Sequence, residues 1–466
     1  MMRALYSGVA GLKTHQTRMD VIGNNIANVN TTAYKSQSMV FSDLMYQTTQ
    51  AASGANATTG VGGINARQIG LGSKTGAIKT AITTQGAAQS TNDPFDVMIT
   101  GESFFIVSNG IENFFTRDGS FYIDGAGNLA MTSNGYNVMG WQVDPADPTA
   151  IKQDTVSALR VMTLENMTYP AAATTSARIA GIIDKKDNDV NSTDGKIMNL
   201  EFYDNKGYKY TARLSVHAIN GDTGEFYVKL DDVLDSDGTS IVPEGTDIKD
   251  LITFNGTAGA TFTPPGGTEQ TVQNAALLKY DASNGNFSYV GAAGGTAVTL
   301  AFDTTAFPSF QNISIDFSAT TNVNNNEYST ATAIRGDSEG RNAGRKVGEM
   351  SGIDIQKDGM IYATYDNGQK RLLGQIAVAT FANASGLAKE GDNLYSATMN
   401  SGEFDGIGTD ITSGGGYMNT GVLEMSNVDL AAEFTEMITT QRGFQANSRI
   451  ITVSDTLLEE LTNLKR

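Results

Sequence analysis

The chain of 466 residues contains no cysteine, two histidines, one tryptophan and eight prolines. Without cysteine it can form neither disulfide bonds nor a thiolate nucleophile or metal site. A histidine-based active site would have to rely on His15 and His217 alone. The net charge of -18 disfavours binding to nucleic acids and anionic membranes, which require basic patches. Composition therefore argues against most classes of enzyme and predicts that there is no catalytic residue and no cofactor.

Long apolar runs are also missing, because no segment approaches the roughly 18 apolar residues of a membrane-spanning helix. The stretch 4–12 follows Arg3 and is reminiscent of a signal peptide. Gly8 and Gly11 dilute it, however, and Lys13 ends it without a small-residue cleavage site. We expect an amphipathic helix that stays on the protein, with any export proceeding without a cleaved signal.

Turn-forming residues are unevenly distributed along the chain. All eight prolines lie between Pro94 and Pro308, and the twelve Asn-Gly or Asp-Gly pairs lie between Asn109 and Gly406. Such pairs supply the positive φ angles of tight hairpin turns. The sequence therefore predicts a multidomain α+β chain, with helical ends around a β-rich interior.

Apolar residues recur at seven-residue spacing near both ends of the chain. The predicted seams comprise Leu5, Val9, Leu12, Met19, Ile22 and Ile26 at one end, and Leu430, Phe434, Met437, Phe444, Ile451, Leu458 and Leu461 at the other. This spacing keeps one edge of a helix against a partner helix. We expect the two helices to pair with each other or with other copies; the alternative is that each packs on its own domain. Ser426 and Asp429 are expected to form a capping box that opens a helix over 428–464.

Composition divides the chain into nested parts. We expect a terminal helical domain that polymerises (1–30 with 426–466), a linker (31–70), an inner β domain (71–145 with 346–425) and an outer β-rich insertion of one or two domains (146–345). The insertion carries 25 acidic and 15 basic residues, so it contributes -10 of the net charge. We expect it to face solvent.

The sequence holds no common catalytic or phosphate-binding motif. Its nearest approach to a metal site is Asp235, Asp237 and Glu244, which match three ligand positions of an EF-hand calcium loop. Val233 stands at the first ligand position and cannot bind calcium, and the acidic loop 187–194 lacks a bidentate glutamate. We therefore predict acidic turns and no metal site, with a secreted calcium-dependent binding or adhesive protein as the alternative.

Motifs at both ends resemble the bacterial flagellar rod and hook axial protein family, and its hook proteins in particular. The N-terminal motif spans 19–28 and includes Gly23, Asn24, Asn25, Ala27 and Asn28. A second block covers 96–105 and 115–119. The C-terminal motifs span 423–430 and 441–449 and include Ser426, Asn427, Gln441 and Arg442. Residues 146–345 match no motif of the family.

This resemblance implies that many copies assemble into a hollow, bendable helical tube, the hook of the extracellular bacterial flagellum. The hook would act as a universal joint that transmits torque from rod to filament, with the terminal helices forming a coiled coil that lines its channel. The implied partners are other copies of the chain, the hook cap, distal rod and hook-filament junction proteins, and the flagellar type III export apparatus. No nucleic acid and no membrane insertion are implied.

A distal rod protein is the rival within the family. The stretch 47–68 resembles an extra segment of rod proteins, which favours the rod. The insertion 146–345 favours the hook, because such rod proteins are usually about half as long, and the motif 427–430 is more hook-like. Some relatives join their subunits covalently through cysteine, a route that is closed to a chain without cysteine.

Overall fold

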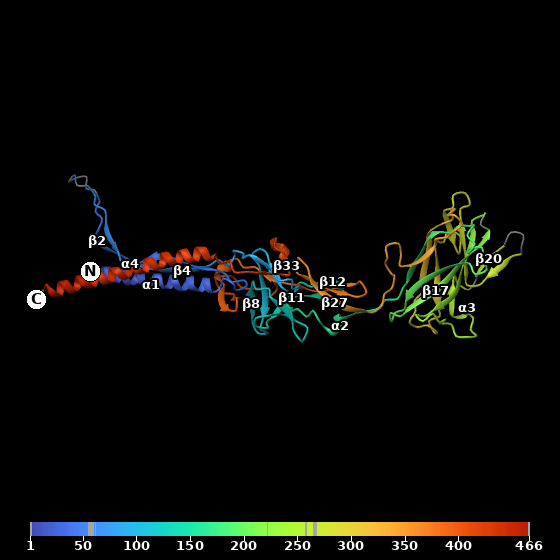
Figure 1. The fold of residues 1–466 in the computed structure, drawn as a ribbon, viewed down its shortest axis with the longest axis horizontal. Coiled ribbons are helices and arrows are strands. Elements are labelled where there is room, and N and C mark those ends of the chain that lie inside the picture. The colour runs from blue at the N-terminus through green and yellow to red at the C-terminus, as the bar shows by residue number, and fades with distance from the viewer. Residues whose placement is uncertain are drawn as a thin grey trace. The chain divides into compact units, whose positions relative to one another are not determined.

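The computed structural model describes residues 2–54, 60, 62–220, 222–256, 259–263 and 268–464. A long helix lies at each end and the interior is mainly β, which confirms the predicted fold class (Figure 1). The chain forms two compact units. Unit 1 comprises Met1–Asn166, Gly352–Thr364 and Lys370–Arg466, and unit 2 comprises Met167–Ser351 and Tyr365–Gln369. None of the described helices is long and apolar enough to cross a membrane.

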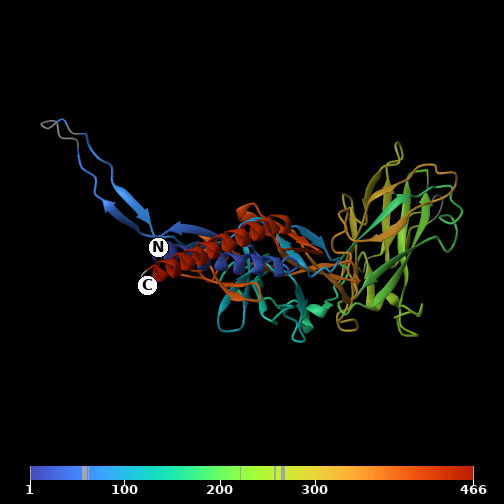
Figure 2. The ribbon, with the colours of Figure 1, turned by 60° about the vertical axis from the view of Figure 1, so that its left-hand side comes forward.

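The terminal helices α1 (Met2–Ala27) and α4 (Leu430–Asn463) lie side by side and antiparallel in unit 1, so the two chain ends are close together (Figures 1 and 2). The Asp429 side chain caps α4 by accepting hydrogen bonds from the backbone N–H groups of Ala431 and Ala432. The expected capping box is therefore wrong in detail, because Asp429 itself occupies the N-cap position and the helix begins at Leu430.

The segment expected to be a linker forms most of a long antiparallel ribbon that follows α1. Strand β1 (Gln37–Asp43) pairs with β4 (Ser73–Thr80), and β2 (Tyr46–Gln50) pairs with β3 (Arg67–Gly70). Part of the polar stretch 47–68, namely 55–59 and 61, lies outside the described residues. Both β1 and β4 contact α1, so the base of the ribbon packs on the N-terminal helix.

The β part of unit 1 is a sheet in the order β28-β29-β11-β7-β8-β32-β31, in which three strands from before unit 2 are flanked on both sides by strands from after it. Its strands are β7 (Phe104–Ser108), β8 (Asn113–Thr116), β9 (Phe121–Ile123), β10 (Leu129–Met131), β11 (Asn137–Asp144), β12 (Asp147–Ile151), β13 (Ser157–Ala158), β28 (Met360–Tyr365), β29 (Lys370–Ile376), β30 (Val378–Ala379), β31 (Ala388–Gly391) and β32 (Leu394–Ser396). Trp141 lies in its core and donates from Nε1 to the carbonyls of Asp154 and Ile407.

Shorter elements complete unit 1 and the segments that join the units. Two short strand pairs precede α4, namely β5 (Ala88–Ser90) with β34 (Val422–Glu424) and β6 (Val97–Ile99) with β33 (Met418–Thr420). The short helices are α2 (Leu164–Met167), η1 (Ala384–Gly386) and η2 (Ile411–Gly414). In the segments that join the units, β14 (Thr168–Tyr169) pairs with β27 (Gly348–Ile355). Because β12 and β13 pair with β11, unit 1 extends to Asn166 and not only to the sequence-derived boundary at 145.

Unit 2 contains two five-stranded sheets, ordered β19-β24-β25-β15-β26 and β16-β17-β18-β22-β23. Its elements are β15 (Ser176–Ile182), β16 (Lys196–Tyr203), β17 (Lys209–Asn220), β18 (Glu225–Leu234), α3 (Ile248–Leu251), β19 (Ile252–Phe254), β20 (Ala260–Phe262), β21 (Gln270–Val272), β22 (Ala275–Tyr280), β23 (Phe287–Val290), β24 (Ala297–Phe302), β25 (Ile313–Thr321) and β26 (Thr332–Arg335). Side chains from both sheets, such as Phe226 and Phe317, share one hydrophobic core. The insertion is thus one compact unit.

The single tryptophan makes the stability of the two units separately measurable. Phe226→Ala removes a fully buried ring that contacts Tyr280, so we expect unit 2 to lose about 3–5 kcal/mol of stability. Urea unfolding should show an earlier circular-dichroism transition, whereas the fluorescence of Trp141 in unit 1 should keep its midpoint. The exposed Tyr208→Ala is the control; an unchanged circular-dichroism transition in Phe226→Ala would contradict the prediction.

Candidate assembly interface

Small and polar residues line the seam between the two terminal helices. The buried residues of α1 include Gly8, Gly11 and Thr14, and those of α4 are Thr440 and Ser454. Such residues allow two helix backbones to approach closely, and they leave little apolar surface in the contact. The helix pair is therefore held by close fit and polar contacts more than by an apolar stripe.

Glycines on each helix receive a side chain from the other. A Cβ atom added to Gly11 would lie 2.7 Å from Asn447 Nδ2, and one added to Gly443 would lie 2.6 Å from His15 Cε1. These distances are too short for non-bonded atoms, so a side chain at either position would push Asn447 or His15 out of its place in the seam. His15 packs against the glycine of the opposite helix and edge-on to Phe41.

Polar contacts fix the other half of the seam. Arg18 Nη2 lies 2.9 Å from Glu436 Oε2, and Asn25 Nδ2 donates to Glu433 Oε1 at 2.8 Å. Burial raises the pKa of Glu433 above its usual 4.5, Glu436 and Asp429 add to the rise, and the Asn25 hydrogen bond opposes it. The ionised form of Glu433 is therefore disfavoured in the helix pair.

Eight of the thirteen residues of the predicted apolar seams are buried or half-buried, and five are exposed. Ile22 is buried, and a second group is half-buried: Leu5, Leu12, Met19, Ile26, Met437, Ile451 and Leu458. Five predicted seam residues are exposed: Val9, Leu430, Phe434, Phe444 and Leu461. The paired face also holds small and polar residues at the same seven-residue spacing, such as Gly8 and His15, which precede Ile22 by fourteen and seven residues. A search restricted to apolar residues could not find that face.

Much of the apolar surface of α4 is left uncovered by α1. Phe434 keeps 50% of its surface exposed, and Ile438 and Val453 keep 58% and 57%. Leu457, Leu461 and Leu464 are exposed as well. Ile438, Val453 and Leu457 were missed by the sequence prediction, although each stands four residues from another exposed apolar residue of α4. Apolar surface gathered along one helix is typical of a protein-protein contact.

The asparagines of the N-terminal motif hold the turn after α1. Asn25 exchanges two hydrogen bonds with the backbone of Gln37, at 2.7 and 2.9 Å, and accepts one from the hydroxyl of Tyr34. Asn24 Nδ2 donates to the same hydroxyl at 3.0 Å, and Asn28 Nδ2 donates back to the Asn24 carbonyl. This part of the motif thus directs the chain from α1 into β1. The motif's Gly23 and Ala27 are exposed at the end of α1.

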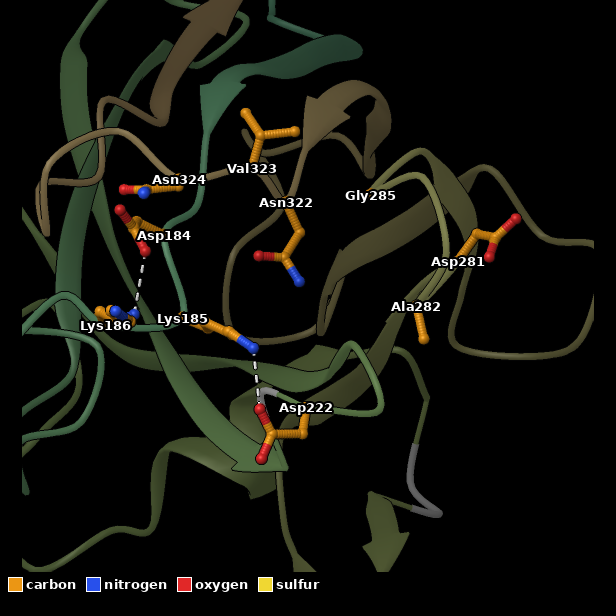
Figure 3. A pocket seen from close by; sticks show the side chains of 10 residues that line it. All are labelled: Asp184, Lys185, Lys186, Asp222, Asp281, Ala282, Gly285, Asn322, Val323 and Asn324. Carbon is orange, nitrogen blue, oxygen red and sulfur yellow. Dashed lines mark hydrogen bonds and ion pairs between the residues drawn. The ribbon is translucent and has the colours of Figure 1, made fainter.

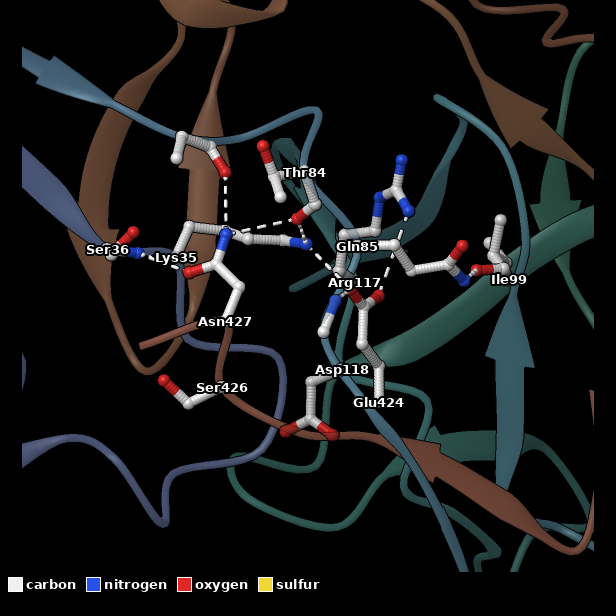
Figure 4. Close-up of polar contacts among 12 residues, drawn as sticks. Lys35, Ser36, Thr84, Gln85, Ile99, Arg117, Asp118, Glu424, Ser426 and Asn427 are labelled. Carbon is white, nitrogen blue, oxygen red and sulfur yellow. Dashed lines mark hydrogen bonds and ion pairs between the residues drawn. The ribbon is translucent and has the colours of Figure 1, made fainter. Parts of the chain in front are cut away.

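The C-terminal motif joins the start of α4 to the same region (Figure 4). Asn427 Oδ1 accepts from the backbone N–H of Ser36 at 2.7 Å, and its Nδ2 donates to the carbonyls of Ala81 and Thr84 at 2.9 and 3.1 Å. Ser426 is buried, and its hydroxyl accepts from the N–H of Val428. The base of each terminal helix is therefore tied to the other.

A buried charge cluster lies beside Asn427 (Figure 4). Lys35 Nζ is 2.6 Å from Glu424 Oε1 and donates to the Thr84 carbonyl at 2.7 Å, and both charged side chains are fully buried. The same carboxylate oxygen accepts from the N–H of Gly86, and Arg117 lies 3.7 Å from the other oxygen. Burial lowers the pKa of Lys35 and that of Arg117, with Glu424 opposing the shift in both. No pattern in the sequence singled out Lys35 or Glu424.

Gln441 and Arg442, the remaining motif residues, are exposed on α4. Neither makes a side-chain hydrogen bond or ion pair with the described residues. Their contribution is thus not to the fold of the single chain.

The acidic side chains in the loops of unit 2 close turns and hold neighbouring loops by accepting backbone hydrogen bonds. Asp235 accepts from the backbone N–H groups of Asp237 and Thr239, which closes a hairpin turn. Buried Asp184 accepts from the N–H groups of Asn325 and Glu327; burial opposes its ionisation, but these bonds keep its pKa below the usual value. Within the described ranges, no three His, Asp or Glu side chains are placed to hold a metal ion.

A cavity of about 240 Å³ lies next to Asp184 and is lined by both positively and negatively charged side chains (Figure 3). Its Lys185 Nζ is 2.8 Å from Asp222 Oδ1, and Lys186 donates its backbone N–H to Asp184. Because these lining charges are already engaged within the chain, the cavity does not present a converging set of groups for a ligand.

Three family models match the chain. They are described as "Flagella basal body rod protein" (residues 5–35), "Flagellar hook protein FlgE/F/G D1 domain" (98–179) and "Flagellar basal body rod FlgEFG protein C-terminal" (419–464). The matches at the two ends cover the helix pair and the base of α4.

Full-length relatives carry matching names. The chain is 35% identical to a "Flagellar hook protein FlgE" of Treponema pallidum and 35% identical to one of Borreliella burgdorferi, over 100% of each chain. It is 29% identical to a "Flagellar basal-body rod protein FlgG" of Bacillus subtilis, also over 100% of both. A crystal structure of Helicobacter pylori hook protein FlgE2 matches at 14% identity and a TM-score of 0.42, covering 72% of this chain and 100% of that one.

The close fit of the seam predicts opposite effects at two glycines of α1. Gly11→Leu would force the side chain into Asn447, so we expect the terminal helices to melt at lower temperature. Gly23→Leu has open space around its Cβ and should raise helix stability by about 0.5–1 kcal/mol through helix propensity. Circular dichroism at 222 nm checks both. Equal stabilisation by the two variants would contradict the packing described here.

The buried ion pair predicts a large effect of a small change. Glu424→Gln leaves Lys35 buried without a counter-charge, so we expect a loss of about 3–5 kcal/mol, measured by urea unfolding with Trp141 fluorescence. The loss should shrink as the pH approaches 10, because Lys35 then becomes neutral at less cost. Lys152→Gln, which breaks an exposed pair with Asp154, is the control and should change stability by less than about 0.5 kcal/mol.

The raised pKa of Glu433 predicts that the stability of the helix pair depends on pH. Because its pKa is raised in the folded state, its stabilising contribution is complete below the unfolded value of about 4.5 and is lost as the pH rises through the folded value. Glu433→Gln keeps the acceptor for Asn25 and removes the charge. We expect a higher melting temperature than that of the unmodified chain at pH 7 and nearly the same one at pH 4. Exposed Glu459→Gln should show no such difference.

Proposed function

The chain belongs to the flagellar hook protein FlgE family, and from this premise we propose how its parts act in the flagellum. As a member of that family it is a structural subunit of the bacterial flagellar hook, which serves motility, and hook proteins polymerise with copies of themselves.

The comparisons favour the hook over the two alternatives. The hook-named relatives of spirochaetes are 35% identical, against 29% for the rod-named protein of Bacillus subtilis. The expectation that a rod protein would be half as long does not separate the two, because that rod-named relative aligns over its full length. The calcium-dependent binding protein has no support among these relatives.

Assembly proceeds through the terminal helices in this proposal. The observation that carries it is the uncovered apolar surface of α4, which keeps Phe434, Ile438 and Val453 about half exposed although α1 already occupies one side of the helix. Exposure of such side chains is unfavourable in a single chain, and head-to-tail contacts between copies would bury them in a helical tube. Gln441 and Arg442, which do not serve the single chain, belong to the same contacts.

The nested order of the chain assigns a different role in the tube to each of its parts. The segments 1–30 and 426–466 form the polymerising domain, and 31–70 belongs to the ribbon beside it. The rest of unit 1 (71–166, 352–364 and 370–425) forms the inner β domain, and unit 2 (167–351 and 365–369) forms the outer region. The buried cluster of Lys35, Glu424 and Arg117 supports this division, because it ties the helix pair firmly to the inner domain. Bending as a universal joint then requires movement between copies.

The export route and the partners of the chain are proposed from its membership of the same family. The chain leaves the cell through the flagellar type III export apparatus without cleavage of a signal peptide, since removal of the first residues would remove Gly8 and Gly11 from the seam. Its neighbours in the flagellum are the hook cap during growth, the distal rod below and the hook-filament junction proteins above. It acts as a building block, without a catalytic site or cofactor.

Electron microscopy of the purified full-length chain tests this function. We expect tubes from the full chain and none from a chain that ends at residue 429, because the shortened chain keeps the Glu424 and Asn427 contacts but lacks α4. Trp141 fluorescence should show that the inner β domain of the shortened chain is folded. A full-length chain that remains monomeric with an ordered helix pair would overturn the proposal.

A further inference from the structure

The exposed apolar residues of α4 form two separate ridges. Ridge A comprises Leu430, Phe434 and Ile438, and ridge B comprises Val453, Leu457 and Leu461. Within each ridge the residues are four positions apart, which is the spacing of the ridges through which helices pack on one another. Every ridge residue keeps at least 38% of its surface exposed.

The two ridges lie on different flanks of the helix. At roughly 100° per residue, the centres of ridges A and B, Phe434 and Leu457, are about 140° apart around the axis. At ~1.5 Å per residue they are also about 35 Å apart along the axis. A single flat partner cannot cover both ridges at once, so α4 has two distinct docking surfaces.

Charged side chains continue each ridge. Arg442 lies one turn beyond Ile438 on ridge A, and Glu460 lies beside Leu461 at the end of ridge B. If two parallel copies of α4 are shifted by 19 residues, Phe434 meets Val453, Ile438 meets Leu457, and Arg442 reaches Glu460. Two apolar pairs then face each other at the centre of the contact, and at one end Arg442 lies over Leu461 with Glu460 beside it.

We propose that ridge A of one copy packs on ridge B of the next in this parallel register, and that Arg442 pairs with Glu460 of that next copy. The inference rests on the proposed function and names the surfaces by which it is carried out. The contact is heterologous, because two unlike surfaces of the same chain meet, and it therefore repeats without limit. It also gives Arg442 a partner that the single chain does not provide.

A second copy fits these ridges better than other occupants. The helix α1 does not cover them, because every ridge residue keeps at least 38% of its surface exposed with α1 in place. An anionic membrane is disfavoured by Glu460 beside Leu461 and by the net charge of -18. The two ridges match each other in length, spacing and terminal charge, as expected of surfaces that bind each other.

Cross-linking tests the register directly, because the natural chain has no cysteine. Ile438→Cys with Leu457→Cys in one chain, assembled into tubes and treated with a short flexible bis-maleimide, should give a ladder of multimers on a denaturing gel. Each single variant should stay monomeric, since ridge A does not meet ridge A. The control pair Thr439→Cys with Thr456→Cys lies at the same heights on other flanks and should give no ladder.

The outcomes distinguish a failure of this inference from a failure of the proposed function. Failure of the unmodified chain to form tubes counts against the proposed function. Tubes in which the double variant stays monomeric, or in which Ile438→Cys alone forms dimers, overturn the heterologous contact while the function stands. Arg442→Glu should slow tube growth several-fold and Glu460→Arg should restore it; unchanged growth in Arg442→Glu, or no restoration, overturns the ion pair.

Discussion

The buried contact between Lys35 and Glu424 determines where the two terminal helices leave the inner β domain. These residues are 389 positions apart, and their charged groups meet at 2.6 Å without access to water. A buried ion pair adds little net stability, because desolvation of both charges opposes their attraction. It does penalise every arrangement in which one charge is buried alone. We infer that its value here is positional, since a shifted strand or helix would separate Lys35 from Glu424.

The helix pair above this contact uses its small residues for its own cohesion. Gly11 and Gly443 admit Asn447 and His15, so α1 and α4 approach closely through a seam with few apolar side chains. As a consequence, the large apolar residues of α4 remain outside the seam and are available to other copies. A seam built from leucine and phenylalanine would have hidden the same residues, and the single chain would then have had nothing apolar left for polymerisation.

The sequence predicted the architecture better than it predicted the interface. Turn pairs and seven-residue spacing correctly placed helices at both ends and β structure between them, because both signals are local. Lys35 and Glu424 could not be found, since an isolated lysine or glutamate looks the same whether or not a distant segment buries it. The apolar period on α4 was visible, but its phase depends on which face α1 occupies. That face is set by Gly443 and Asn447, whose small or polar side chains carry no hydrophobic signal.

The positions of ridges A and B on α4 also bear on the shape of an assembly. Because the ridges are about 140° apart and not opposite each other, a row of helices joined through them cannot be flat. It must curve toward the side of the smaller angle, which is the side of α4 that carries Arg442, Gln445 and Arg449 and faces away from α1. Polar side chains would then line the concave side and α1 would lie on the convex side. A curved row with a repeating axial shift is a helical tube, so the curvature of the polymer follows from the placement of six apolar side chains on one helix.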